Sequence, residues 1–273
     1  MKPAAATLAL PLLLAALAGC GGDREAPSTE TRPAGDRGSA DVAVTPQTPA
    51  PQGTSPAPGY TVAPVENAGR VTGRIVFQGT PPPPSPIAVN KDVTVCGREK
   101  HVSEDLVVGS GGGIANAVVS LQGISSGKAF AADARPVLDQ RGCWFHPHVQ
   151  VIPAGATLEI LNNDGILHNV HTYPANNPPV NMAQPKFRKV LTTSFARPDV
   201  VKVACDVHGW MTAWIVVAGH PYHAVTGADG RFVLDGVPVG TYTLHVWHES
   251  LGTREQPVSV GPGGTVEATI TFG

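Results

Sequence analysis

Charged residues are scarce in this 273-residue sequence, in which Asp, Glu, Lys and Arg make up 15% and the formal net charge is −2. Basic residues form no run, so the composition gives no indication of binding to nucleic acid or to an anionic membrane surface. The sequence also lacks the zinc-protease pattern HExxH and a phosphate-binding glycine loop. We therefore expect that the protein is not an enzyme.

Long amphipathic helical patterns are missing too, whereas glycine (31) and proline (27) are abundant. This composition favours short strands that are joined by turns. Alternating apolar and polar residues predict strands at 71–77, 114–121, 148–152, 157–161, 200–204, 213–217, 231–234, 242–247 and 266–272. The expected fold class is all-β, built as sandwiches.

The N-terminus has the features of a targeting segment. Lys2 precedes an apolar stretch at 4–18, which is too short and too rich in alanine for a transmembrane helix. It resembles a bacterial lipoprotein signal peptide (1–19), in which cleavage precedes Cys20 and lipid is attached to that thiol. A plain secretory signal is the alternative, and in both cases the protein is exported. The lipoprotein reading implies a location on the periplasmic face of a bacterial membrane, with the lipid as the only attachment.

The segment after the signal peptide is rich in proline and small polar residues. Residues 21–66 contain eight prolines and a single aromatic residue, Tyr60. Such a composition does not bury enough apolar surface to offset the entropy that ordering costs. We therefore expect a disordered tether at 20–66, with folded structure beginning near residue 67.

Cysteine numbers are informative in an oxidising compartment. If lipid occupies Cys20, three cysteines remain, Cys96, Cys143 and Cys205. An odd number leaves one thiol unpaired or otherwise occupied, and a metal is one such occupant. Cys96 and Cys143 are the natural disulfide partners, although the sequence alone does not fix this pairing.

One short segment concentrates metal-binding side chains. Cys205, His208 and Met211 offer a thiolate, an imidazole and a thioether within seven residues, immediately after an apolar strand. Soft sulfur ligands combined with imidazole suit copper, above all when it cycles between Cu(I) and Cu(II). His168, upstream, supplies the second imidazole of a trigonal site with a weak axial methionine. The sequence thus predicts one copper ion per chain.

The region around these residues resembles a cupredoxin, the family of plastocyanin and azurin. The resemblance runs from about 137 to 218 and begins with FHPHVQVIPAGATLEILNND at 145–164, followed by the phrase ending in His168 and Asn169. It implies a Greek-key sandwich, which we place at 126–218, and the ligands His168, Cys205, His208 and Met211. The spacing of His208 and Met211 is like that of amicyanin.

The resemblance also implies roles for neighbours of the ligands. In the family, the asparagine after the first histidine, here Asn169, ties the two ligand loops together by hydrogen bonds. The residue after the cysteine is usually small and polar but here is Asp206. The second loop histidine, here His208, reaches a hydrophobic docking patch, which Gly209 and Trp210 would frame.

The C-terminal part contains a second family pattern. Residues 225–244, VTGADGRFVLDGVPVGTYTL, resemble the hairpin of the carboxypeptidase regulatory-like, transthyretin-type sandwich, which we place at 219–273. Two further phrases of that family occur far upstream, at 69–75 and 117–121. The segment 67–125 is therefore either the first half of this sandwich, into which the copper domain is inserted, or part of a separate module.

Three functions are compatible with these patterns. The first is a type 1 (blue) copper protein that carries single electrons to or from an unidentified redox partner protein. The second is a periplasmic protein that binds or handles copper without electron transfer. The third is an adhesive or scaffold β-protein.

Overall fold

The computed structural model describes residues 59–132 and 135–273. The predicted signal peptide, the lipidation site Cys20 and most of the predicted tether therefore lie outside the described residues. Within the described ranges, no helix is long and apolar enough to cross a membrane.

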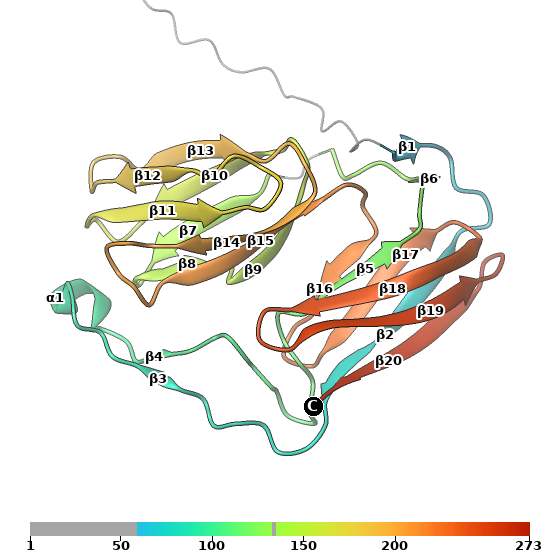
Figure 1. Cartoon of the computed structure of the whole chain (residues 1–273), viewed down its shortest axis with the longest axis horizontal. Helices are drawn as coiled ribbons and strands as arrows, with labels where there is room; N and C mark the ends of the chain where they lie inside the picture. Colours follow the sequence, from blue (N-terminus) through green and yellow to red (C-terminus); the bar gives the residue numbers. More distant parts are fainter. Residues whose placement is uncertain (1–58, 133–134) are drawn as a thin grey trace, which may run out of the picture. The chain divides into compact units, whose positions relative to one another are not determined.

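Two β-sandwiches make up most of the described chain, and the predicted all-β class is confirmed (Figure 1). The first sandwich has one sheet in the order β13-β10-β7-β8 and another in the order β12-β11-β14-β15-β9. Its strands are β7 (Val137–Arg141), β8 (Trp144–His146), β9 (Val149–Pro153), β10 (Thr157–Asn162), β11 (His168–Tyr173), β12 (Asn181–Gln184), β13 (Val190–Ser194), β14 (Asp199–Ala204) and β15 (Thr212–Ala218).

Apolar side chains from both sheets form the core of the first sandwich. Because side chains alternate between the faces of a strand, every second residue of β14 and β15 points inward. Val201, Val203, Ile215 and Val217 do so, and all four are at most 2% exposed. From the opposite sheet, Leu158 and other residues of β7, β8 and β10 complete the same cluster. This core supports the segments that carry the predicted ligands.

The second sandwich has one sheet in the order β16-β5-β18-β19 and another in the order β17-β2-β20, with a core of its own. Its strands are β2 (Gly69–Phe77), β5 (Val118–Gln122), β16 (His223–Val225), β17 (Arg231–Val237), β18 (Gly240–His248), β19 (Gly252–Val260) and β20 (Thr265–Phe272). The predicted DGRFVLDGVPVGTYTL hairpin corresponds to β17 and β18, which lie in different sheets.

Strand pairing shows how the chain connects the two sandwiches. β2 pairs with β17 and β20, and β5 pairs with β16 and β18, so both upstream phrases lie in the second sandwich. The strands of the first sandwich, β7 to β15, all fall between β5 and β16 in the sequence. Of the two arrangements that the sequence left open, the pairing corresponds to the insertion.

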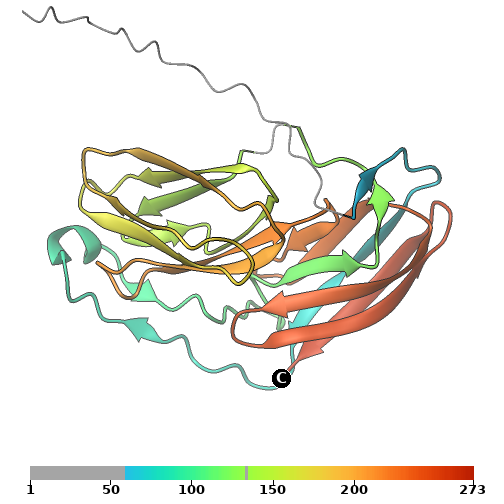
Figure 2. The ribbon, with the colours of Figure 1, turned by 45° about the horizontal axis from the view of Figure 1, so that its top comes forward.

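A long connection between β2 and β5, residues 78–117, reaches from the second sandwich to the first, and we call it the strap (Figures 1 and 2). It contains β3 (Pro86–Ile87), which pairs with β4 (His101–Val102), and the four-residue helix α1 (Val93–Cys96). A disulfide joins Cys96 of the strap to Cys143 of the first sandwich, and both residues belong to the first sandwich's core cluster.

Ordered structure begins earlier than the composition predicted. Tyr60 is only 8% exposed and lies in the core of the second sandwich, where its ring meets Tyr222 edge to face. The next residues form β1 (Thr61–Val62), which pairs with β6 (Ser126–Gly127). The tether boundary predicted at residue 66 is therefore too late, because a single buried aromatic residue holds this segment on the core.

A buried ion pair links the two sandwiches. Glu249, in the turn between β18 and β19, bonds the Nε2 atom of His148 and also accepts a hydrogen bond of 2.6 Å from the indole N–H of Trp214. A second carboxylate, that of Glu104 in the strap, lies 3.8 Å from Nδ1 of His148. Burial lowers the pKa of His148, but these carboxylates outweigh it and the net shift is upward.

Replacing Glu249 with glutamine is expected to lower the free energy of unfolding by about 1–3 kcal/mol at mildly acidic pH. Since the pKa of His148 is raised in the folded state, the stabilisation is complete below the ordinary histidine pKa of 6.5 and is lost as pH rises through the folded pKa. Urea unfolding of both proteins across this range measures the difference. Glu255→Gln, which changes an exposed residue of β19, is the matched control. A pH-independent difference would contradict a charged His148.

Candidate metal centre

The predicted ligands lie at one end of the first sandwich, on two neighbouring segments. His168 is the first residue of β11, and Cys205 directly follows β14, which pairs with β11. The loop from Cys205 to Met211 turns back into β15 and is closed by two backbone bonds, from N–H of Cys205 to the carbonyl of Met211 (3.2 Å) and from N–H of Met211 to the carbonyl of His208 (2.9 Å). Strand pairing therefore sets the distance between the ligand segments.

Three ligand atoms converge in the interior. Sγ of Cys205 lies 3.9 Å from Nδ1 of His168 and 3.8 Å from Nδ1 of His208, and the two Nδ1 atoms are 3.0 Å apart. None of the three residues is more than 1% exposed. Three donor atoms at these separations can all reach a single metal ion, because Cys sulfur binds at about 2.3 Å and His nitrogen at about 2.0–2.1 Å in comparable sites.

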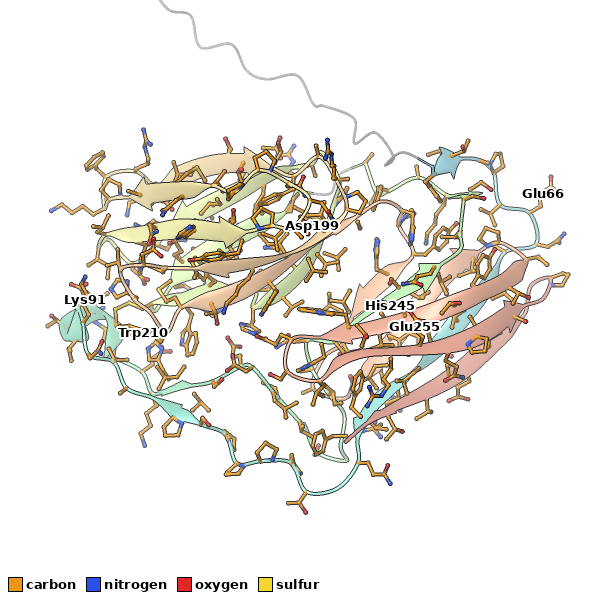
Figure 3. All side chains as sticks on the ribbon, viewed as in Figure 1. Glu66, Lys91, Asp199, Trp210, His245 and Glu255 are labelled. Atoms are coloured by element: carbon orange, nitrogen blue, oxygen red, sulfur yellow. A yellow bond between two sulfur atoms is a disulfide. The ribbon has the colours of Figure 1, made fainter. Side chains whose placement is uncertain are left out.

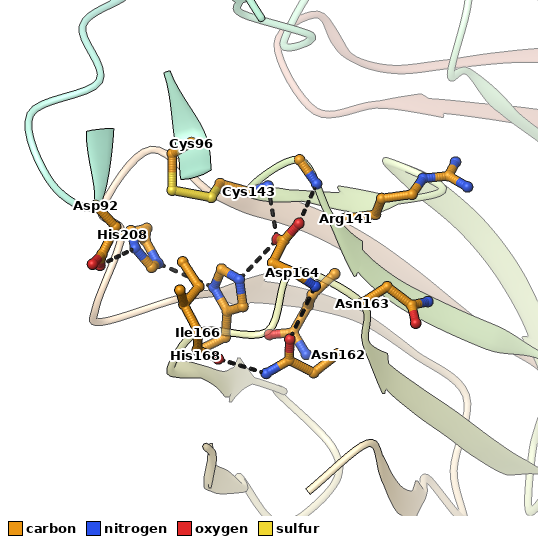
Figure 4. A network of polar contacts seen from close by, with 12 residues as sticks. Asp92, Cys96, Arg141, Cys143, Asn162, Asn163, Asp164, Ile166, His168 and His208 are labelled. Atoms are coloured by element: carbon orange, nitrogen blue, oxygen red, sulfur yellow. Dashed lines mark hydrogen bonds and ion pairs between the residues drawn. A yellow bond between two sulfur atoms is a disulfide. The ribbon is translucent and has the colours of Figure 1, made fainter. Parts of the chain in front are cut away.

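The outer nitrogen of each histidine contacts a carboxylate (Figure 4). Nε2 of His168 lies 2.9 Å from Asp164, and Nε2 of His208 lies 3.0 Å from Asp92. Asp164 also accepts the backbone N–H groups of Gly142 (2.5 Å) and Cys143 (2.9 Å), so its position is fixed. A carboxylate on the outer nitrogen sets the tautomer and the ring orientation of a metal-binding histidine. Both imidazoles are thereby arranged with Nδ1 facing the thiol.

The electrostatics of the site favour the metal-binding form of the thiol. Burial raises the pKa of Cys205, but the His168 ring and nearby backbone N–H groups lower it, and the net shift is downward. For His208, burial is the leading cause of a lowered pKa, which favours the neutral ring. For His168, burial lowers the pKa while Asp164 and Cys205 raise it, with a net upward shift. Thiolate and neutral imidazole are the forms that coordinate metals.

A hydrogen-bond network connects the two ligand segments behind the thiol. The side-chain oxygen of Asn169 accepts the backbone N–H of Asp206 (2.6 Å), and its amide donates to the Asp206 carboxylate (2.9 Å). Asn181 and His171 also contact that carboxylate, each at 3.1 Å. His171 thus lies beside Asp206, outside the group formed by the three ligand atoms. Asn169 joins the loops as the cupredoxin resemblance implied.

Met211 is fully buried in the core cluster that also contains Cys205. Its backbone lies in the same turn as the two downstream ligands, because its N–H bonds the carbonyl of His208. The structure therefore places the Met211 side chain in the apolar core that also contains Cys205.

The surface position expected for His208 is wrong. His208 is 0% exposed, because the strap covers it and Asp92 bonds its outer nitrogen. Lys91, from the same part of the strap, and Trp210 lie at this end of the molecule (Figure 3). The ring of Trp210 is 5.2 Å from that of His208, and its indole N–H donates to the carbonyl of Cys143 (3.2 Å). A strap between β2 and β5 is not part of the sequence pattern that the resemblance rests on, which starts near 137.

The sequence patterns did not predict the two carboxylates that contact the outer nitrogens of the candidate histidine ligands. Asp164 stands four residues before His168, in the same Asn-Asn-Asp phrase that carried the resemblance, so a signal was present. Asp92 is 116 residues from His208 and follows no recognisable pattern. The donor set of one thiolate and two imidazoles, with a buried thioether nearby, fits copper better than the harder cations that prefer oxygen ligands.

Comparisons with known proteins agree with parts of this description. A family model of the carboxypeptidase regulatory-like domain matches residues 212–273, which include the hairpin on which the predicted resemblance rested. No curated protein matches the sequence.

Several solved structures resemble part of the chain. The Cu-containing nitrite reductase (NirK) from Thermus scotoductus is 24% identical, with a TM-score of 0.27, over 33% of this chain and 24% of that chain. Amicyanin from Paracoccus versutus is 19% identical, with a TM-score of 0.28, over 37% of this chain and 97% of amicyanin. The purple cupredoxin from Nitrosopumilus maritimus is 21% identical, with a TM-score of 0.27, over 32% of this chain and 100% of that protein. The chain thus spans about a quarter of the nitrite reductase, and at such low TM-scores the assignment of the centre depends on its own geometry.

Proposed function

We propose that this chain binds one copper ion through His168, Cys205 and His208, with Met211 as a weak fourth ligand, and that it carries single electrons without turning over a substrate. The observation that carries the proposal is the convergence of two Nδ1 atoms and one Sγ atom within 3.0–3.9 Å in a buried site. Copper bound there supplies a Cu(II)/Cu(I) couple. The partner would be a redox protein.

The residues around the ligands suit that role because they keep the geometry fixed. Asp164 and Asp92 hold the two imidazoles from outside, and Asn169 holds the two ligand segments together. Ligands whose positions are fixed by packing and by further hydrogen bonds do not have to rearrange when the charge at the centre changes. Burial of all three donors excludes water from the site.

Addition of Cu(II) to the purified chain tests the proposal. We expect an intense visible thiolate-to-copper absorption band, one copper per chain and a reversible one-electron wave in voltammetry. Copper binding without a reversible wave would favour the copper-handling alternative. Absence of both the absorption band and bound copper would overturn the assignment of the copper centre and would favour the third alternative, an adhesive or scaffold protein.

Met211→Leu is expected to retain copper and to raise the reduction potential. Loss of the thioether removes a sulfur that donates electron density to the metal, and the apolar leucine side chain excludes water from the site. Both changes disfavour Cu(II) relative to Cu(I). If Met211 only packs, the near-isosteric leucine changes stability by less than about 1.5 kcal/mol and leaves the potential unmoved. Voltammetry of the two proteins separates these outcomes, and an unchanged or lowered potential with copper intact would remove Met211 from the ligand set.

We also propose that the protein is a lipoprotein on the periplasmic face of a bacterial membrane. The support is the sequence at 1–20, an apolar stretch that ends in Leu-Ala-Gly-Cys. Cys20→Ser is expected to abolish incorporation of labelled fatty acid and to leave the protein uncleaved or in the soluble fraction. Fatty-acid labelling that persisted in this variant would show that Cys20 is not the lipidated residue.

A further inference from the structure

The disulfide of the strap lies directly against the candidate copper centre. The sulfur atoms of Cys96 and Cys143 and a ring nitrogen of His208 all lie within 4.8 Å of one another. The sulfur of Cys143 is also within 4.8 Å of a ring nitrogen of His168. Both cysteines are at most 1% exposed. This bond therefore holds two further sulfur donors beside the histidines of the centre.

We propose that reduction of this disulfide creates a second Cu(I) site, formed by the thiolates of Cys96 and Cys143, while His208 stays with the first centre through Nδ1 and with Asp92 through Nε2. The identity of the metal rests on the proposed function, because a centre that receives copper is where a second copper ion would arrive. Thiolates are soft ligands that select Cu(I), and metal ligation deprotonates a thiol. In the disulfide form neither sulfur is a thiolate, so the second site exists only after reduction.

The reduction step needs a dithiol as co-reactant. Its two S–H groups supply two electrons and two protons, the Cys96–Cys143 bond breaks, two protein thiols form and the dithiol becomes a disulfide. Each protein thiol then releases its proton as it binds Cu(I). Since both sulfur atoms are buried, the strap has to move before the dithiol can attack.

The surroundings of Cys96 contain a further donor without a partner. His101 is 3% exposed and stacks on Trp144 with ring centroids 4.7 Å apart, and its Nε2 contacts the carbonyl of Cys96 (2.8 Å). Its Nδ1 is buried and has no hydrogen-bond partner among the described residues. Buried polar atoms are rarely left unpaired, and one that is calls for an explanation such as an ion. Since His101 forms no ligand group with the two sulfur atoms, this nitrogen is a buried donor near Cys96 and is not counted in the proposed site.

Anaerobic titration with Cu(I) against a chromogenic chelator tests the proposal on the full chain. All proteins carry Cys20→Ser, which removes the remaining thiol outside the two sites. The oxidised protein is expected to bind about one Cu(I) and the dithiol-reduced, desalted protein about two, with thiol assay verifying that two additional thiols have formed. Reduced protein that gains both thiols and still binds only one Cu(I) would overturn the inference.

Two variants separate this inference from the proposed function. Cys205→Ser keeps the disulfide. In its oxidised form this variant is expected to bind no Cu(I) tightly, and in its dithiol-reduced form it is expected to bind one Cu(I). Cys96→Ser combined with Cys143→Ser is expected to bind one Cu(I) under both conditions. If the double variant fails to fold, Cys205→Ser alone decides, because a reduced Cys205→Ser protein without bound Cu(I) contradicts the second site whatever the first site does.

Discussion

Replacing Cys205 with serine is expected to abolish the visible absorption of the copper-loaded protein. The thiolate is the donor for that transition, and the sulfur of Cys205 is the only free thiol among the described residues. A serine hydroxyl at this position stays protonated and is a poor copper ligand, so the trigonal set is reduced to two imidazoles. We expect total loss of the band rather than a shift.

The fold should survive this substitution. Cys205 is buried, and a hydroxyl in its place costs about 1–3 kcal/mol if it finds no hydrogen-bond partner. Circular dichroism should still report a β-protein, which shows that loss of the band is not a consequence of unfolding. Cys20→Ser, which also removes one thiol, is the matched control and should keep the spectrum. An unchanged band in Cys205→Ser would mean that another residue supplies the sulfur.

Asp164→Ala is expected to lower both stability and copper affinity. Alanine leaves three donors without their acceptor, the ring of His168 and the N–H groups of Gly142 and Cys143. Breaking a buried carboxylate–histidine interaction of this kind costs about 2–5 kcal/mol. Removal of an outer partner of a metal-binding histidine typically lowers metal affinity about 10–100-fold. Chemical unfolding and competitive copper titration measure the two effects.

The stability effect of Asp164 should depend on pH in a defined direction. Burial raises the pKa of Asp164, but His168 and the two N–H groups outweigh it, and the net shift is downward from the ordinary aspartate pKa of 3.8. Its contribution is therefore complete above that value and is lost as pH falls through the folded pKa. Asp235→Ala is the control, because its carboxylate is half-exposed and pairs only with Arg70 at the surface. That variant should cost less than about 1 kcal/mol and leave copper affinity unchanged.

The candidate ligands, whose donor atoms the structure brings together, could be singled out because they stand in local patterns. A thiol, an imidazole and a thioether in one short loop after a strand, and a histidine after an Asn-Asn phrase, are visible without knowledge of the fold. The strands that alternate clearly were found for the same reason, as at 266–272 for β20. In contrast, β19 has the polar sequence GTREQPVSV with a proline near its centre, so periodicity gave no indication of it.

Contacts between segments that are distant in the sequence could not be predicted from local patterns. The pairing of β2 with β20 and the bond between Asp92 and His208 join residues more than a hundred positions apart. No local rule relates such residues. The sequence therefore favoured neither an inserted first sandwich nor two consecutive modules, and it indicated an exposed His208. The residues around Tyr60 are typical of disordered chains, so composition places Tyr60 in the tether, whereas the structure buries its ring in the core of the second sandwich and pairs the next residues, β1, with β6.

The position of β2, which is the first strand of the second sandwich in the sequence, affects the order in which the chain can acquire its structure. Its parallel partner β20 is the last strand of the described residues, so β2 has no partner on that side until every strand between them has been synthesised. The strands β7 to β15, in contrast, pair only among themselves and come from one continuous stretch of sequence. Pairings between distant segments form slowly, and unpaired strand edges are prone to aggregate. During synthesis, β2 is therefore expected to remain without its β20 partner for longer than any strand of the first sandwich remains unpaired.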